Sequence, residues 1–406
     1  MSVVCEYLVT MGRVARRRHA IFVFQSLILV TTLFTLSLWL KCNSSKVLPS
    51  RDTESHFERP SQRKNCRPQK NVVFIKTHKC GSSTISNIIL RYGMRYGLDF
   101  ALPVIDNGHL GWPESIRPEH VEPLPPGRVY NMVIHHCTYN ETTFKRMMPR
   151  DAKYISVVRE PFAQFSSALN YFFEEIGQLR FETNNRVREF LSNPQKYERK
   201  LSFKFASVPF GKRSITKNFM STELGFEVRN SNNELKIQEF LSSVLENFDL
   251  VMVFEYFEES VILLRRLLCW TMYDVIHLGV NRRHTISGDA RNKAAVSNRL
   301  REIHRYHSNV DYRLYHITND SFWNKIAKEG PAFFDEVRHF RLVLKSVRKF
   351  CREKNHHILT VEQSRWNREF PVDLRECASM RKLPKKFTFD IGRLMNLPKY
   401  GTRPDG

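Results

Sequence analysis

The residue types that favour chemistry are concentrated in one short stretch, residues 76–84, which reads KTHKCGSST. Gly81 allows the backbone to approach a ligand closely, and small hydroxyl residues follow it. Lys79 adds a mobile positive charge beside them. The start of a helix attracts phosphate because its first N–H groups are free and carry the positive end of the helix dipole. The residues that we expect to hold an anionic donor here are Lys76, Thr77, Lys79, Gly81, Ser82, Ser83 and Thr84.

Two adjacent histidines, His135 and His136, end the apolar run 129–134. A histidine near neutral pH can take a proton from a hydroxyl group. Side chains alternate along a strand, so the two rings should point to opposite sides and one should face the site. We favour His136, which lies further toward the carboxyl end, and His78 is a further candidate; a purely structural pair is the alternative.

Arg159 and Ser167, eight residues apart, form the third group of candidate residues. A guanidinium grips phosphate with two parallel hydrogen bonds, and a hydroxyl adds another. The alternative is a surface ion pair of Arg159 with Glu160. Further along, Arg282 and Arg283 either close over the phosphates or are solvated surface charges.

Short apolar runs that alternate with helical patterns position these residues. Residues 72–75 read as a buried strand, and Ile85, Ile88, Ile89 and Tyr92 follow on one face at helical spacing. A second strand, 154–158, runs into a helix from Pro161 to about residue 176. A third, near residues 248–257, also leads into a helix. The order predicts an α/β fold with a central parallel sheet flanked by helices, in which ligands lie at the carboxyl edge of the strands.

These motifs resemble the galactose 3-O-sulfotransferase family over roughly residues 66–330. The loop has the order of the sulfotransferase 5′-phosphosulfate loop, and Arg159 with Ser167 matches the family's 3′-phosphate pair. Residues 109–113 (HLGWP), 255–260 (EYFEES), 267–270 (LLCW) and 281–283 (NRR) are also similar to family strings. Cys80 and Ser166 depart from the better-known members, which leaves the branch open.

The resemblance implies a P-loop-like sulfotransferase fold, 3′-phosphoadenosine 5′-phosphosulfate as donor, and a galactose-terminated glycolipid or glycoprotein as acceptor at its 3-hydroxyl. Lys79 would neutralise the leaving oxygen, His135 or His136 would be the base, and His78 would orient donor or acceptor. No metal and no nucleic acid are expected. The alternatives are another glycan hydroxyl, or a non-catalytic protein that binds anionic glycans. A lumenal kinase is disfavoured because the Walker lysine position and a magnesium carboxylate are missing.

The chain has 406 residues and a formal charge of +23, so anionic partners are expected. We predict a cytosolic tail (1–19), a transmembrane anchor (20–40), a lumenal stem (41–70), a catalytic domain (71–345) and a basic C-terminal extension (346–406) whose residues after Lys382 are flexible. The 21 uncharged residues from Ala20 to Leu40, preceded by an arginine cluster, predict a type II protein of the Golgi membrane. A cleaved signal peptide is the alternative, but its apolar core would be shorter.

Six cysteines would then be lumenal, where disulfides persist, although the sequence cannot pair them. Three glycosylation sequons begin at Asn43, Asn140 and Asn319. The glycan class of the acceptor and the oligomeric state are left open by the sequence.

Overall fold

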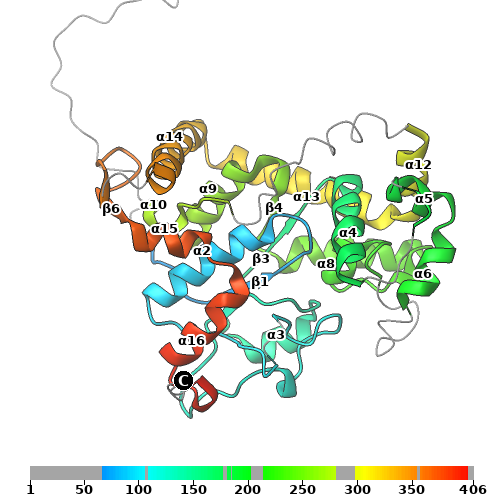
Figure 1. Ribbon diagram of the computed structural model, residues 1–406, viewed down its shortest axis with the longest axis horizontal. Helices are drawn as coiled ribbons and strands as arrows, with labels where there is room; N and C mark the ends of the chain where they lie inside the picture. Colours follow the sequence, from blue (N-terminus) through cyan, green and yellow to red (C-terminus); the bar gives the residue numbers. More distant parts are fainter. Residues whose placement is uncertain are drawn as a thin grey trace, which may run out of the picture. The chain divides into compact units, whose positions relative to one another are not determined.

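The computed structural model describes residues 66–105, 108–176, 181–183, 185–202, 214–279, 298–353 and 357–400. These residues belong to one compact unit of the chain, residues 59–406 (Figure 1). The predicted anchor, Ala20–Leu40, and most of the predicted stem lie outside the described residues. Within the described part, no helix is long and apolar enough to cross a membrane.

Four parallel strands form the central sheet: β1 (Val72–Ile75), β2 (Met132–Val133), β3 (Lys153–Val158) and β4 (Leu250–Val253). Their order across the sheet is β2-β1-β3-β4. Every residue of β1 and β4 is buried, as expected for a parallel sheet that is covered on both faces. The predicted α/β class and the predicted strands are confirmed, although β2 is shorter than the apolar run 129–134 that contains it.

The helices that precede β4 are α2 (Ser82–Arg95), η1 (Pro118–His120), α3 (Glu141–Met147), α4 (Pro161–Ile176), α5 (Arg186–Ser192), α6 (Pro194–Ser202), α7 (Phe219–Glu223), η2 (Val228–Asn230) and α8 (Glu234–Asn247). After β4 come η3 (Phe254–Tyr256), α9 (Phe257–Leu268), α10 (Met272–Val275), α12 (Asn298–His307), α13 (Asn309–Lys328) and α14 (Ala332–Glu353). The chain continues with a two-stranded antiparallel sheet, β5 (Ile358–Val361) and β6 (Phe370–Asp373), then α15 (Leu374–Arg381), η4 (Pro384–Phe387), α16 (Thr388–Leu394) and η5 (Pro398–Tyr400).

The strand order creates a switch point between β1 and β3. From β1 the chain moves to β2 on one side, and then returns to β3 on the other side of β1. Such a reversal leaves a crevice at the carboxyl ends of the two central strands, where α/β proteins bind ligands. The loop before α2 and the residues before α4 both start at this edge.

Two apolar clusters support the switch point. The main core surrounds the sheet and includes residues of α2, α9, α13 and α14. A second cluster joins α4, α5, α6 and α12, which lie together at the right of Figure 1. Phe165 and Phe190 are at its centre, 2% and 0% exposed. Because α4 starts directly after β3, this cluster fixes the helix that carries Ser167.

The end of the predicted stem is fastened to the sheet unit. Cys66 forms a disulfide with Cys269, the residue that caps α9. The backbone N–H of Gln69 donates to the carbonyl of Leu268 at 2.9 Å, and the Trp270 indole N–H donates to the carbonyl of Gln69 at 3.0 Å. The chain therefore enters β1 from a fixed point.

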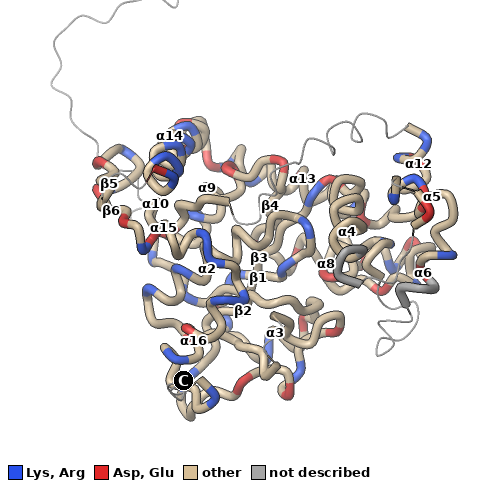
Figure 2. Tube along the Cα trace, in the orientation of Figure 1, with Lys and Arg blue, Asp and Glu red and all other residues tan. Residues whose placement is uncertain are grey.

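The C-terminal segment belongs to the same compact unit as the sheet. The boundary predicted at residue 345 lies inside α14, which carries several basic residues along its length (Figure 2). The residues after Lys382, which we expected to be flexible, form η4 and α16, where Phe387 and Ile391 are 2% and 0% exposed. A disulfide between Cys351 and Cys377 joins the end of α14 to α15.

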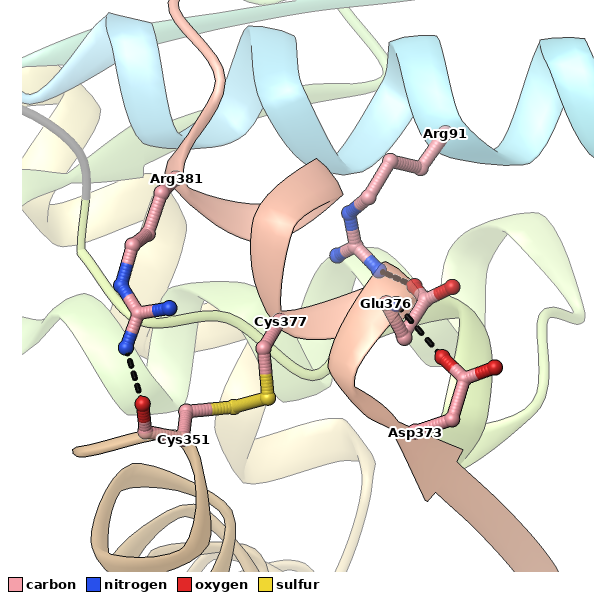
Figure 3. Close-up of a disulfide and its surroundings, with 6 residues drawn as sticks. All are labelled: Arg91, Cys351, Asp373, Glu376, Cys377 and Arg381. Atoms are coloured by element: carbon pink, nitrogen blue, oxygen red, sulfur yellow. Dashed lines mark hydrogen bonds and ion pairs between the residues drawn. A yellow bond between two sulfur atoms is a disulfide. The ribbon is translucent and has the colours of Figure 1, made fainter. Parts of the chain in front are cut away.

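A buried arginine on α2 holds this segment in place (Figure 3). Arg91 is 3% exposed and donates to Glu376 of α15 at 2.6 Å. It also donates to the Ile276 carbonyl and, at 3.0 Å, to the Asn87 side chain. Buried charges need such partners, because an unpaired charge in a core is strongly unfavourable.

Replacing Arg91 by Met should lower the free energy of unfolding by about 3–5 kcal/mol, since Glu376 would lose its shortest ion pair and the Ile276 carbonyl would lose the Arg91 donor. Urea unfolding of the two proteins would measure this. Arg338→Met is the matched control, because Arg338 pairs with Asp335 on the surface with 68% of its side chain exposed and exposed pairs contribute little. Equal losses for the two variants would contradict the assignment.

Candidate active site

The loop between β1 and α2 has the shape of an anion-binding turn. Lys79 and Gly81 have left-handed backbone angles, with φ of 64° and 76°. The N-cap residue of α2 is Gly81, which has no side chain to cap the first N–H groups. Turns of this kind direct successive N–H groups into one concavity, and an uncapped helix start adds the positive end of its dipole. The loop is therefore a candidate cradle for a phosphate group.

Several side chains of the loop shape it from within. The Thr77 hydroxyl is buried and donates to the Val157 carbonyl of β3. The Ser82 hydroxyl donates to the Thr77 carbonyl at 2.5 Å. Thr84 is 4% exposed, and Ser83 is half-buried at the loop surface. In this structure Thr77 and Ser82 therefore hold the turn together, a contribution that the sequence did not reveal.

Arg159 contacts the same loop from the end of β3. Its guanidinium donates to the Lys79 carbonyl at 3.0 Å and lies 4.7 Å from the centre of the Phe254 ring. Glu160 does not pair with it; this carboxylate caps α4 by accepting from Phe162 N at 3.2 Å and Ala163 N at 2.7 Å. The structure thus brings Arg159 and the Lys79 loop together, across 80 residues of sequence.

Helix α4 lies beside this contact. Ser167 is half-buried on α4, and the Lys79 ammonium lies 4.0 Å from the centre of the Tyr171 ring on the same helix. Arg282 and Arg283, the other predicted donor contacts, lie outside the described residues. Lys79 and Arg159 are therefore brought together at the switch point, and Ser167 lies on the helix that carries Tyr171.

The two adjacent histidines point in different directions. The His136 ring stacks on His78, with centroids 3.8 Å apart and planes 17° from parallel. The His135 ring turns to α16, where its Nε2 lies 3.4 Å from the Thr388 hydroxyl. His136 is therefore the member of the pair beside the loop, in agreement with the alternation of side chains.

The tautomer of His136 follows from its contact. Its Nδ1 lies 3.0 Å from the Lys76 carbonyl oxygen, which can only accept. Nδ1 must therefore carry the proton, and Nε2 keeps the lone pair. Burial, together with His78 and Lys76, holds the pKa of His136 well below its usual range. This imidazole is neutral at pH 7.

Glu223 is a functional candidate that sequence reasoning missed. It is 0% exposed at the end of α7 and accepts from the His78 backbone N–H at 2.6 Å. Its other oxygen lies 2.5 Å from His78 Nδ1 and 4.0 Å from His136 Nδ1. No local pattern marks Glu223 in the sequence, because the residue is 145 positions from His78 in a short helix without a motif.

Burial and positively charged neighbours also lower the pKa values of other groups around the loop. Burial lowers the pKa of Lys76 to about 8, although the Glu223 carboxylate opposes the shift. Burial lowers the pKa of His109 to about 4 and that of His135 to about 3. Burial at this site therefore favours the neutral form of His109, His135 and His136.

Aromatic rings line the outer side of His78. Trp112, Phe219 and Phe172 have ring centroids 4.9, 5.3 and 5.4 Å from the His78 ring. An isolated parallel β-bridge between His109 and His136 holds the loop that contains Trp112 beside His78. Such rings give a site an apolar wall with a few polar groups, the usual lining of a small-ligand pocket.

Among the described residues, His78, His136 and Glu223 form the one group that presents three metal-binding atoms, all within 4.8 Å of one another. In this structure the contacts of the group are hydrogen bonds: His78 Nδ1 lies 2.5 Å from Glu223, and His136 Nδ1 faces the Lys76 carbonyl at 3.0 Å. Each ring then keeps the lone pair on its Nε2.

The sequons differ in their settings. Asn140 is exposed at the N-cap of α3, where its side chain accepts from Thr143 N. Asn319 lies within α13 and is half-buried. Asn43 lies outside the described residues. Asn140 has the surface position that glycosylation requires.

Replacing Gly81 by Ala should weaken nucleotide binding by at least tenfold in calorimetry. An added Cβ would lie 2.6 Å from a Phe254 ring atom, and φ of 76° strains any L side chain. Gly97→Ala is the matched control, since Gly97 has φ of 62° with nothing within 4 Å of an added Cβ. If both variants bind nucleotide like the wild type, the loop does not form the cradle.

Comparisons with known proteins agree with this geometry. A family model described as galactose-3-O-sulfotransferase matches residues 8–376. Galactosylceramide sulfotransferase from Homo sapiens is 28% identical over 319 residues, which are 76% of this chain and 70% of that protein. The Mus musculus protein of the same name is 30% identical over 70% of this chain and 65% of its own length. Galactose-3-O-sulfotransferase 2 from Homo sapiens is 30% identical over 71% of each chain. The chain belongs to the galactose-3-O-sulfotransferase family.

Proposed function

We propose that this protein transfers a sulfuryl group from 3′-phosphoadenosine 5′-phosphosulfate to the 3-hydroxyl of a galactose residue. The observation that carries the proposal is the hydrogen bond from the Arg159 guanidinium to the Lys79 carbonyl at the β1–β3 switch point. It unites an anion-binding loop and a phosphate-gripping side chain in one place. A donor with phosphates at both ends of its ribose needs two such sites.

Each end of the donor has its own set of residues. The N–H groups at the start of α2, with Ser83 and Lys79, suit the 5′-phosphosulfate. Arg159 and Ser167 suit the 3′-phosphate, because a guanidinium binds phosphate through parallel hydrogen bonds. Lys79 would also neutralise the charge that grows on the bridging oxygen as the nucleotide leaves.

The acceptor hydroxyl must lose a proton as it attacks sulfur. His78 and His136 are the imidazoles beside the loop, and general-base help of this kind contributes about 10²–10⁴ in rate. His135 turns away from the loop toward Thr388, so its replacement should mainly affect stability. Trp112 and Phe172 would line the acceptor side of the site.

The names of the relatives support galactose as the sugar: one group acts on galactosylceramide and another is named for galactose 3-O-sulfation. A galactose-terminated glycolipid and a glycoprotein glycan are both proposed acceptors. A different glycan hydroxyl is the alternative within the same chemistry. A non-catalytic glycan-binding protein would not need Arg159 on the Lys79 loop.

We further propose that the protein is a single-pass type II protein of the Golgi membrane with a lumenal catalytic unit. The charge-free stretch Ala20–Leu40 and the arginines before it support this orientation. The Cys66–Cys269 and Cys351–Cys377 disulfides also support it, because such bonds persist in oxidising compartments.

Incubation of the protein with sulfur-labelled donor and a panel of galactosides tests the activity. We expect label on β-galactosides with a free 3-hydroxyl and none on 3-deoxygalactosides, since the 3-hydroxyl is the proposed attacking group. Mapping of the product by mass spectrometry fixes the position. Transfer to the 3-deoxy compounds would contradict the proposed position, and absence of transfer to every glycan would contradict the activity.

Replacing Arg159 by Ala should weaken binding of adenosine 3′,5′-diphosphate by about 2–3 kcal/mol, because a charge-assisted phosphate contact is lost. Binding of 5′-AMP should change far less in the same calorimetric titration. Arg188→Ala, an exposed arginine on α5, is the control and should leave both nucleotides unaffected. Equal losses for the two nucleotides would mean that Arg159 acts only by supporting the Lys79 carbonyl.

A further inference from the structure

Glu223 makes two contacts with one residue of the loop. One carboxylate oxygen accepts the His78 backbone N–H at 2.6 Å, and the other lies 2.5 Å from His78 Nδ1. The Glu223 side chain is 1% exposed and that of His78 is 9% exposed. Because each of its two oxygens contacts His78, the buried Glu223 carboxylate is fixed in orientation relative to the ring.

The contact determines the tautomer of His78. An ionised carboxylate has only acceptors, so the Nδ1 that faces it must be the protonated nitrogen. Nε2 then keeps the lone pair and is free to take a proton. The same logic applies to a histidine oriented by an aspartate in hydrolases, where the carboxylate also stabilises the imidazolium once it forms.

His136 lacks this support. Its Nδ1 donates to a neutral carbonyl at 3.0 Å, and the nearest Glu223 oxygen is 4.0 Å away. A proton gained by His136 would therefore be a buried positive charge beside Lys76, without a carboxylate in hydrogen-bond contact. A proton gained by His78 would be shared with Glu223 directly.

The position of Glu223 is fixed by an exchange of caps between α7 and α13. Asp311 of α13 accepts from Met220 N at 3.2 Å and Ser221 N at 2.8 Å at the start of α7. In return the Asn218 side chain accepts from Val310 N at 3.0 Å and Asp311 N at 3.2 Å at the start of α13. This double contact leaves α7 little freedom to move relative to α13.

We propose that Glu223 is a positioning residue that orients His78 and stabilises its protonated form, and that His78 is the base of the reaction. The inference rests on the proposed sulfuryl transfer. The acceptor oxygen forms a bond to sulfur, the bond from sulfur to the bridging oxygen of the 5′-phosphate breaks, and adenosine 3′,5′-diphosphate leaves with that electron pair. The hydroxyl proton moves to His78 Nε2. His136, stacked on His78, stays neutral.

The other titratable groups around His78 favour this division of roles. Lys76 and His109 interact electrostatically with the His78–His136 pair from β1 and from the Trp112 loop. Cys80 and Asp311 interact electrostatically with Glu223, and Arg159 interacts electrostatically with Cys80. Among these described groups, Glu223 is the carboxylate in hydrogen-bond contact with an imidazole of the pair.

Glu223→Gln tests the proposal, since the amide keeps the shape and removes the charge. Its NH₂ group can donate to Nδ1, which would place the ring proton on Nε2 and block it as a base. We expect kcat to fall by about 10²–10⁴ while affinity for adenosine 3′,5′-diphosphate stays within threefold. The acid limb of the kcat/KM profile should move to lower pH, because the imidazolium loses its negative partner.

Two further variants and one spectroscopic measurement complete the test. Glu246→Gln, on the exposed face of α8, should leave rate and profile unchanged. The double variant His78→Ala, Glu223→Gln should be no slower than His78→Ala alone, because the two residues act as one unit. NMR of protein labelled with nitrogen-15 histidine should show His78 as the Nδ1–H tautomer at neutral pH.

The results separate this inference from the proposed function. A wild-type protein that transfers sulfate, with a Glu223→Gln variant of near-normal kcat and unchanged profile, would overturn the role of Glu223 alone. An Nε2–H tautomer for His78 would overturn it regardless of activity or of how the variant folds. A wild-type protein without transferase activity, but with the Nδ1–H tautomer, would overturn the proposed function and preserve the contact.

Discussion

The parallel pairing of β1 with β3 is the contact on which the candidate site depends. It sets Val72–Ile75 against Lys153–Ser156, so the two strands deliver their carboxyl ends to the same edge of the sheet. The Thr77 hydroxyl on the Val157 carbonyl and Arg159 on the Lys79 carbonyl extend this pairing beyond the last ladder bond. Because side chains alternate along a strand, a slip of one residue would turn Arg159 away from the loop.

Buried charges give the fold its specific arrangement around that edge. Glu223 contacts His78, Glu336 contacts Arg265 and Arg266, and Glu376 contacts Arg91. Each carboxylate comes from an element distant in sequence from its partner. Ion pairs in a core add little net stability, but a misplaced partner is strongly unfavourable. Such pairs therefore discriminate between the native packing of these helices and alternatives with the same apolar contacts.

The C-terminal segment supports the elements that carry the site. Thr388 of α16 lies against His135, and Arg128, just before β2, donates to the Met395 carbonyl at 2.8 Å. The Cys351–Cys377 disulfide and the Arg91–Glu376 pair bring α15 to α2, the helix that follows the anion-binding loop. A segment that the basic sequence suggested was an appendage thus supports both β2 and α2.

The sequence alone determined the elements whose signals are local: the buried strands, the Gly81 turn, the start of α4 at Pro161 and the alternation that separates His135 from His136. These follow from residue types within a few positions of one another. Only the tertiary structure decided that Glu223 meets His78, that Thr77 and Ser82 shape the loop, that Cys66 pairs with Cys269, and that residues 383–400 are packed. These contacts join residues that are far apart along the chain or depend on how a side chain turns after folding. Composition and spacing cannot predict these contacts, because many sequences with the same local patterns could place another carboxylate, or none, beside the histidine.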